Sequence, residues 1–293
     1  MIIATQTADY RAELVGVFGH PVAENPTVVM HEAAYAEFGM NWRYLTIEVL
    51  PRDLNDAMLG LRAMNMRGIN LTIPHKVEVL RYLDRLSEAA ELMGAVNTVV
   101  NNEGELFGEN TDGKGFLRAL TQDAGVDPEG TQVVVFGAGG ASRAITVELA
   151  LAGAQEITIV NRSPQRGHTL VDLLNTKTPT SATYSAWDGP FQISDDTDIV
   201  INATSIGLFP DIGAEPNLDY STLTPDMTVC DVIHSPTTPF LRRAHQQGST
   251  TLDGVSMLVY QGAIGFKLWT GRDAPIEIMY EALAKAFGLE PSS

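Results

Sequence analysis

Short apolar runs alternate with longer amphipathic stretches over the first 110 residues of the chain. The runs, rich in β-branched and aromatic residues, predict strands at residues 14–18, 44–49, 68–73, 96–100 and 105–107. The amphipathic stretches predict helices at residues 26–39, 54–64 and 77–86. Strands and helices in this order are typical of an α/β domain.

The same pattern resumes in the second half of the chain. Apolar runs predict strands at residues 132–136, 156–160, 198–203 and 227–232, with helices between them. Two further helical stretches are expected at residues 256–269 and 275–287. We therefore expect a second α/β domain, with a boundary near residues 108–114 and a weaker second crossing near residue 254.

Charge and cysteine content limit which binding partners and which cellular compartment are expected. The 293 residues carry a formal net charge of −17, which repels phosphate backbones and anionic lipid. Nucleic acid and membrane surfaces are therefore not expected as partners, and no apolar stretch is long enough to span a bilayer. The single Cys230 and the lack of a signal-peptide pattern predict a cytoplasmic protein. The six histidines form no ligand-spaced cluster, so no metal site is expected.

The clearest chemical motif follows the apolar run at residues 132–136. Gly137, Ala138, Gly139, Gly140 and Ala141 form a glycine-rich turn between that strand and the next helix. Glycines there permit a tight turn and let the backbone approach a pyrophosphate, which the helix N-terminus attracts. A lone glycine motif is weak, but its place between a strand and a helix is the context that supports it. The turn predicts a dinucleotide-binding site.

The residues after the next strand indicate which dinucleotide binds. Many NAD sites place an acidic residue there to bind the ribose 2′-hydroxyl. This chain has Asn161, Arg162 and Ser163, followed by Arg166. Two guanidinium groups and a hydroxyl suit a 2′-phosphate, which a carboxylate would repel. We therefore expect NADP(H) as the cofactor; the alternative is an ordinary doubly wound domain with solvated arginines.

Lys76 and Asp112 are candidates for proton transfer. Lys76 follows a strand and lies in the expected first turn of a helix, where the dipole and partial burial would favour its neutral form. A lysine tuned in this way exchanges protons near neutral pH. Asp112 precedes a helix expected at residues 116–123 and can pair with Lys76 as a proton relay. Each residue also has a plainer interpretation, as a solvated lysine and as a helix-capping aspartate.

Seven motifs occur along the chain in the order typical of one enzyme family. They are residues 70–76 (NLTIPHK), 94–98 (GAVNT), 110–113 (NTDG), the glycine turn, 161–163 (NRS), 202–207 (NATSIG) and 257–263 (MLVYQGA). Together they resemble the shikimate dehydrogenase family, including its quinate-directed members, from about residue 14 to the C-terminus. Seven motifs in register are hard to explain by chance.

The resemblance implies a fold and a reaction. It implies an N-terminal α/β substrate domain at residues 1–112, joined by the helices of about 255–293, and a Rossmann-like NADP domain at residues 113–254, with a cleft between them. It implies reversible reduction of 3-dehydroshikimate to shikimate with NADPH, so the partner would be a small anionic substrate. The protein would be a monomer or a homodimer.

The resemblance also implies roles for individual residues. By match, Lys76 and Asp112 are the catalytic pair, and Thr204 and Gly254 lie near the cofactor. Five residues bind the substrate: Asn25, Thr27, Thr72, Asn97 and Gln261.

Three positions depart from the family's pattern. The family binds the substrate carboxylate with two serines, where this chain has Asn25 and Thr27. Both can still donate hydrogen bonds, although Asn25 is equally well explained as a helix cap. His234 replaces the family's usual tyrosine, which changes the shape of the pocket and its response to pH. These departures leave quinate or another hydroxylated cyclohexane(ene) carboxylate open as the substrate. A non-catalytic NADP(H)-sensing protein is the other alternative, and the presence of both Lys76 and Asp112 speaks against it.

Overall fold

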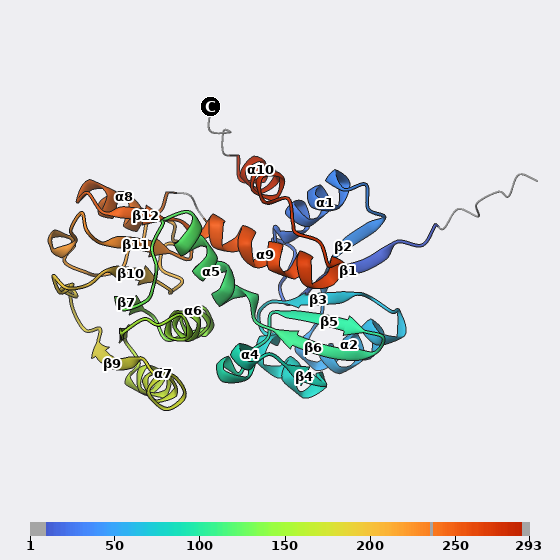
Figure 1. Ribbon diagram of the computed structural model, residues 1–293, viewed down its shortest axis with the longest axis horizontal. Helices are drawn as coiled ribbons and strands as arrows, with labels where there is room; N and C mark the ends of the chain where they lie inside the picture. Colours follow the sequence, from blue (N-terminus) through green and yellow to red (C-terminus); the bar gives the residue numbers. More distant parts are fainter. Residues whose placement is uncertain (1–9, 235–236, 289–293) are drawn as a thin grey trace, which may run out of the picture.

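The computed structural model describes residues 10–234 and 237–288 of the chain. Figure 1 shows two α/β units side by side, with helices α5 (Thr111–Gln122) and α9 (Gly254–Thr270) between them. Each unit is built around one six-stranded sheet. The expected fold class, an α/β protein with two domains, is confirmed.

The first sheet is mixed, with the strand order β2-β1-β3-β5-β6-β4. Its strands are β1 (Glu13–Gly19), β2 (Trp42–Glu48), β3 (Gly68–Leu71), β4 (Arg85–Leu86), β5 (Thr98–Asn102) and β6 (Glu105–Glu109). Glu103 and Gly104 both have a positive φ and form the two-residue turn between β5 and β6. β1 and β3 are parallel, so the segments that follow them start at the same edge of the sheet. That edge brings Asn25 and Lys76 to one side of the unit.

Helices from both ends of the chain cover the first sheet. α1 (Thr27–Glu37), α9 and α10 (Ile276–Ala286) form one apolar cluster with β1, in which Met30, Phe266 and Met279 are fully buried. α2 (Leu54–Ala63) packs on a second cluster with β3, and the short helices α3 (His75–Glu78) and α4 (Glu88–Met93) lie beside it. Trp269 fixes α9 to the sheet because its indole N–H donates to the Val99 carbonyl at 2.9 Å.

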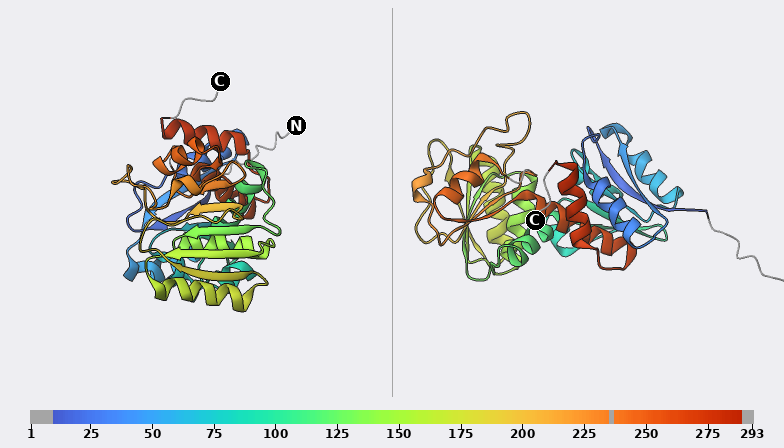
Figure 2. Two further views of the ribbon diagram at one scale, coloured as in Figure 1. Left: turned by 90° about the vertical axis from the view of Figure 1, so that its left-hand side faces the viewer. Right: turned by 90° about the horizontal axis from the view of Figure 1, so that it is seen from above.

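The second sheet is entirely parallel, with the order β12-β11-β10-β7-β8-β9. Its strands are β7 (Gln132–Phe136), β8 (Glu156–Asn161), β9 (Ser181–Ala186), β10 (Ile199–Asn202), β11 (Thr228–Asp231) and β12 (Thr250–Leu252). α6 (Gly140–Leu151) and α7 (Pro164–Lys177) cover one face, and α8 (Pro239–Gln246) covers the other (Figure 2). The central strand β7 has β8 on one side and β10 on the other. Such a switch in strand order opens a crevice at the carboxyl ends of the strands, where ligands bind in this architecture.

Several expected elements differ from the structure. The helix expected at residues 77–86 is wrong: α3 is a single turn, followed by a 3₁₀ turn at Val79–Tyr82 and by β4. The apolar residues of this stretch do not lie on one helix face. Leu86 pairs with β6, and Val77 is 63% exposed in the wall of the cavity described below. Strands β9 and β12 were not expected; both are edge strands, and the exposed polar side chains that such strands carry hide the apolar pattern.

In the part of the chain that the structure describes, no helix combines the length and the apolar character that crossing a membrane requires.

Candidate active site

A cavity of about 490 Å³ lies between the two units. Both units contribute to its walls, and α9 closes one side. The wall contains eleven residues that the sequence singled out: Asn25, Thr27, Thr72, Lys76, Asn97, Asp112, Gly140, Ala141, Thr204, His234 and Gln261. The structure therefore brings the expected substrate contacts and the end of the glycine turn to one place.

Lys76 and Asp112 form an ion pair inside this cavity, although 36 positions separate them in the sequence. The Lys76 Nζ donates to Asp112 Oδ2 at 2.6 Å. The other carboxylate oxygen accepts from Asn97 Nδ2 at 2.8 Å, so Asp112 is held from two sides. The Lys76 side chain remains 32% exposed, which leaves its ammonium within reach of a bound ligand. The pair has the composition and the access that proton transfer requires.

The local structure around Asp112 differs from the sequence interpretation. α5 begins at Thr111 rather than at residue 116, and Asn110 caps it by accepting from the Asp112 N–H at 3.1 Å. Asp112 is therefore not the cap, and its carboxylate is available to Lys76. Gly113 follows directly, and a Cβ there would lie 2.3 Å from the Ala144 carbonyl oxygen of α6. The missing side chain allows α5 to begin in direct contact with the nucleotide-side helix.

Lys76 lies in α3 as expected, but α3 has only four residues. The macrodipole of a helix sums over aligned peptide units, so one turn contributes little. The expected effect of a helix dipole on Lys76 therefore loses its basis. Contact with Asp112 is the electrostatic feature that the structure puts in its place.

A buried network of amide and hydroxyl groups surrounds Asn97, the residue that bonds to Asp112 of the Lys76–Asp112 pair. Asn97 Oδ1 accepts from the Thr111 N–H at 2.6 Å, and Asn97 Nδ2 also donates to Thr111 Oγ1 at 3.0 Å. Gln261 donates from Nε2 to the Leu258 carbonyl at 3.0 Å, while its Oε1 accepts from Thr111 Oγ1 at 3.4 Å. In this arrangement Asn97 orients Asp112. Contact of Asn97 and Gln261 with substrate stays a prediction.

Asn25 and Thr27 also line the cavity, and they are hydrogen-bonded to each other. Asn25 Oδ1 accepts from the Thr27 N–H at 3.0 Å and from the Thr27 hydroxyl. Because Oδ1 faces both donors, the amide nitrogen of Asn25 is the atom left for a ligand. Pro26, and not Asn25, occupies the N-cap position of α1, while Asn25 accepts from the N–H of the first helical residue through Oδ1. Contact of its amide nitrogen with a ligand stays a prediction.

Tyr44 and Asn70 belong to the same network, and the sequence interpretation missed both. The Tyr44 hydroxyl lies 3.1 Å from Thr27 Oγ1 and donates to Asn70 Oδ1 at 2.8 Å. Asn70 Nδ2 donates in turn to the Asn97 carbonyl at 3.1 Å. Burial raises the pKa of Tyr44, so the phenol keeps its proton. A polar Asn70 inside the fully buried strand β3 was the one available signal.

The glycine turn fits a pyrophosphate. Gly137 has φ +109°, and a Cβ there would lie 2.9 Å from the Ala203 carbonyl oxygen. Open space lies in front of Gly139 and Gly140, so their backbone faces a region that a phosphate can enter. Ser142, at the position of the usual third glycine, is fully buried and donates from Oγ to the Gly137 carbonyl at 2.8 Å. The Ser142 hydroxyl thus links the first turn of α6 to the start of the glycine turn.

The residues expected to select NADP(H) follow β8, outside the cavity wall. Asn161 ends the strand and donates from Nδ2 to the Ser163 carbonyl at 2.9 Å, and the Ser163 side chain caps α7. Arg162 and Arg166 are exposed, and neither forms an ion pair with another described residue. Two unpaired cations beside the nucleotide turn suit an added phosphate.

The loop after β11 carries His234 into the cavity wall. Asp231 ends β11 and is buried; desolvation raises its pKa to about 6, against four hydrogen bonds that lower it. Its carboxylate accepts from Asn202 Nδ2 at 3.0 Å and from the Ile233 N–H at 3.1 Å. Gly254 lies against the same loop, since a Cβ there would be 2.4 Å from the Ile233 carbonyl oxygen. Gly254 and Asp231 therefore set the position of this loop.

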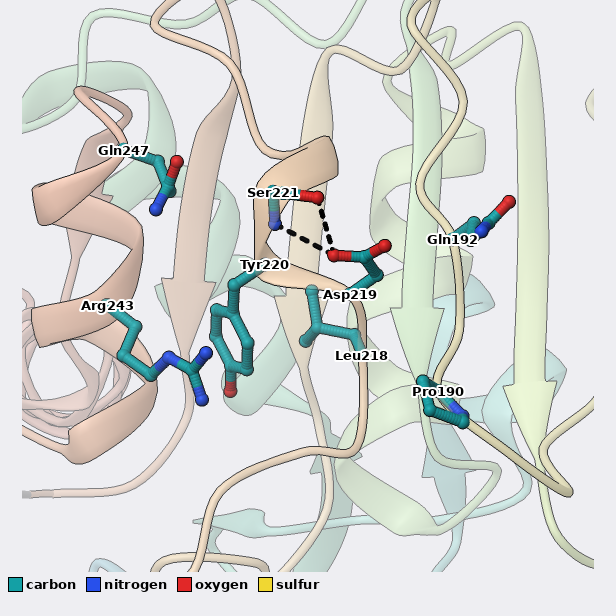
Figure 3. Close-up of a pocket in the computed structure, with 8 residues that line it drawn as sticks. All are labelled: Pro190, Gln192, Leu218, Asp219, Tyr220, Ser221, Arg243 and Gln247. Carbon is teal, nitrogen blue, oxygen red and sulfur yellow. Dashed lines mark hydrogen bonds between the residues drawn. The ribbon is translucent and has the colours of Figure 1, made fainter.

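Figure 3 shows a second groove, of about 750 Å³, on the α8 side of the second sheet. Arg243 stacks on the Tyr220 ring at 3.8 Å and is ion-paired with Glu215 at 2.5 Å. Asp219 accepts from the Ser221 N–H at 3.0 Å. The charged groups of this groove are paired with neighbours, and no residue expected in the site lies in it. The smaller cavity with Lys76 is therefore the candidate active site.

Three family models match this chain in succession. The shikimate dehydrogenase substrate binding domain matches residues 17–99, the shikimate/quinate 5-dehydrogenase model matches residues 119–208, and the shikimate 5′-dehydrogenase C-terminal domain matches residues 254–284. A shikimate dehydrogenase (NADP(+)) from Desulforamulus reducens is 42% identical over 278 residues, which cover 94% of this chain and 96% of the relative.

Solved structures agree in fold over nearly the whole chain. The ligand-free 5-ketofructose reductase of Gluconobacter sp. strain CHM43 has a TM-score of 0.91 and 48% identity, covering 95% of this chain and 100% of that one. The shikimate 5-dehydrogenase from Listeria monocytogenes, solved with shikimate and NAD, has a TM-score of 0.88 and 37% identity, covering 95% and 99%.

Proposed function

The chain belongs to the shikimate dehydrogenase family, and from this membership we propose that it interconverts 3-dehydroshikimate and shikimate with NADP(H). One observation carries the proposal: Lys76 and Asp112 form a 2.6 Å ion pair in a cavity that also reaches the first residues of α6. A protein that only senses a ligand has no use for a proton-transfer pair in contact with it.

The residues divide the work as follows. The bound nicotinamide supplies the hydride in the direction of reduction. Lys76 donates a proton from Nζ to the substrate carbonyl oxygen as the alcohol forms, and its amine takes that proton back in the reverse direction. Asp112 holds the lysine in place, and Asn97 holds Asp112 through its second oxygen. Thr72, Asn25 and Thr27 line the cavity as contacts for the rest of the substrate.

The cofactor is NADP(H). The curated relative carries NADP(+) in its name, and the turn from Gly137 to Ala141 provides the open backbone that a pyrophosphate requires. Arg162 and Arg166, with the hydroxyl of Ser163, would hold the 2′-phosphate, and Asn161 orders the segment that carries them. Thr204 and Gly254 would lie near the nicotinamide, since Thr204 lines the cavity and Gly254 supports the loop of His234.

A second candidate substrate is 5-ketofructose. The reductase for that compound shares 48% identity with this chain, and the Listeria monocytogenes shikimate dehydrogenase shares 37%. The Thr27 hydroxyl is directed at Asn25, so an uncharged amide is the group that these two residues offer to a ligand. Lys76 is the one lysine or arginine among the described lining residues, and it is already ion-paired. Such a site accommodates a neutral polyhydroxy ketone as well as a carboxylate.

A substrate comparison separates the two candidates. NADP+ reduction with shikimate and NADPH oxidation with 3-dehydroshikimate and 5-ketofructose would be followed at 340 nm, and kcat/KM compared. If the shikimate carboxylate binds at Asn25 and Thr27, replacing both by serine raises kcat/KM for shikimate and leaves 5-ketofructose turnover no better. Turnover of 5-ketofructose alone would favour the second candidate, and turnover of neither would refute both.

Three further expectations stay predictions: a cytoplasmic location, domain boundaries at residues 112 and 254, and a monomeric or homodimeric state.

A further inference from the structure

Tyr184 lies behind the loop that carries Arg162, and none of the steps above uses it. It belongs to β9, the edge strand that pairs in parallel with β8. Its hydroxyl donates to the Asn161 carbonyl at 3.0 Å. The bond therefore reaches from the outermost strand of the sheet to the residue at which β8 ends and the loop begins.

Gly167 on α7 provides the space that the Tyr184 ring occupies. A Cβ on Gly167 would lie 2.3 Å from Cδ2 and 2.5 Å from Cε2 of the tyrosine, so the ring packs directly on the helix backbone. The His168 ring lies beside it, with 4.6 Å between the two ring centroids. The half-buried Tyr184 ring also packs against the apolar core of the second unit. These contacts hold the ring so that its hydroxyl is directed at the Asn161 carbonyl.

The hydrogen bond from Tyr184 fixes the peptide group between Asn161 and Arg162. This carbonyl and the Arg162 N–H belong to one planar unit, so holding the carbonyl sets the direction in which the chain continues. The Trp187 N–H points to the same carbonyl at 3.4 Å, which is long for such a bond, and the tyrosine contact is the shorter one. Asn161 Nδ2 donates to the Ser163 carbonyl, which closes the loop on itself without tying it to β9. Tyr184 therefore ties the start of the loop to the neighbouring strand.

We propose that Tyr184 is a positioning residue for the choice of cofactor: it fixes the peptide before Arg162 and thereby directs this arginine to the 2′-phosphate of NADP(H). The inference rests on the proposed role of Arg162. An exposed arginine loses conformational freedom when it binds a phosphate, and a backbone that is fixed beforehand lowers this cost. NAD(H) has no 2′-phosphate, so its affinity does not depend on the alignment of Arg162.

A double-mutant cycle of Y184F and R162A tests the inference. Isothermal titration calorimetry would give the Kd for NADP+ and for NAD+ without any need for turnover. Phenylalanine keeps the ring and removes the hydroxyl alone, so Y184F should raise the Kd for NADP+ about fivefold, as expected for one hydrogen bond, and leave the Kd for NAD+ unchanged. The double variant should bind NADP+ as weakly as R162A and no more weakly, because Tyr184 acts through Arg162. T183A is the control, since Thr183 is exposed on the same strand and its hydroxyl contacts Thr158.

G167A tests the same contact from the side of α7. Its new Cβ would displace the Tyr184 ring, while alanine itself suits a helix. G167A should therefore raise the Kd for NADP+ as Y184F does, and combining the two substitutions should cause no further loss.

Three results would overturn the inference. The first is an unchanged NADP+ affinity in Y184F. The second is an equal loss of NADP+ and NAD+ affinity in Y184F, which would show that Tyr184 supports the fold of the unit rather than the choice of cofactor. The third is additive losses in the double variant. In each case a selective loss of NADP+ affinity in R162A leaves the proposed 2′-phosphate site intact, whereas an R162A protein with wild-type affinity for both nucleotides would refute that site and this inference with it.

Discussion

Replacing Glu148 by glutamine should stabilise the protein, and the gain should grow with pH. Glu148 lies on α6, 6% exposed, with its Cγ 2.6 Å from the position that a Cβ on Gly113 would occupy. One of its carboxylate oxygens is buried with no hydrogen-bond partner among the described residues. Burial raises its pKa from 4.5 to about 7, Lys114 counteracts this and Glu109 adds to it. A buried carboxylate of this kind costs stability whenever it is ionised.

The sign and the size of the stability change follow from the pKa of Glu148 in the unfolded chain, 4.5, and in the folded chain, about 7. Below 4.5 the carboxyl is protonated in the folded and the unfolded chain, so the substitution changes little. Between 4.5 and about 7 the unfolded chain ionises first, and the folded state loses stability as the pH rises. The full shift corresponds to about 3 kcal/mol at 1.36 kcal/mol per pKa unit. The gain of E148Q should therefore be about 2 kcal/mol larger near pH 8.5 than near pH 5.5.

Urea unfolding at these two pH values measures the effect. Both lie above the sequence pI of about 4.6, where low net charge would promote precipitation. The midpoint should rise with an unchanged slope, since the surface exposed on unfolding is the same. E129Q on the surface is the matched control and should change the free energy of unfolding by less than about 0.5 kcal/mol. A gain of equal size at both pH values, or a loss near pH 8.5, would refute the reasoning.

Three other predictions concern the site and its support. K76A and D112N should each lower kcat by about 10²–10⁴-fold with NADPH affinity unchanged, as measured by steady-state kinetics and fluorescence titration; full activity in either variant would contradict the proton-transfer role. R162A and R166A should each raise the KM for NADP+ about tenfold, at the low end for a hydrogen bond to a charged group because both side chains are exposed, and leave the KM for NAD+ unchanged. An equal rise for both nucleotides would argue against a 2′-phosphate contact. G113A should lower the free energy of unfolding by about 1–3 kcal/mol, because the new Cβ meets the Ala144 carbonyl oxygen at 2.3 Å, whereas G189A, with open space around it, should not; equal thermal unfolding of the two variants would contradict the close approach of α5 and α6.

Local patterns were enough to predict the nucleotide unit. The apolar run of β7, the glycine turn and the helix after it are adjacent in the chain, so their geometry depends on neighbouring residues. The same holds for the strands expected at residues 96–100 and 105–107, which form the adjacent strands β5 and β6. Where an element depends on distant partners, the pattern misled. Residues 77–86 have helical spacing, yet the end of this stretch is strand β4, because it pairs with β6.

Sequence motifs identified most residues of the candidate site, but not which of these residues contact one another. Lys76 and Asp112 were identified from motifs, while their 2.6 Å contact depends on how α3 and α5 are placed by different strands. Tyr44 was missed because it looks ordinary in its strand, and the polar Asn70 in buried β3 signals a buried partner without identifying it. Their pairing depends on the register of β1 with both β2 and β3, which no single segment encodes.

The path of the chain through the first unit has a consequence for how the protein is made. β1 ends at Gly19, yet α9 and α10, which supply Phe266, Trp269 and Met279 to the same apolar cluster, begin at Gly254 and Ile276. At roughly 5–20 residues per second, the ribosome needs roughly 10 to 50 seconds to add the residues between them. During that time α1 is the one of the three helices α1, α9 and α10 that can cover this face of the N-terminal sheet. The second unit also takes Met257 and Tyr260 of α9 into its core, so neither unit can complete its core until translation is nearly finished.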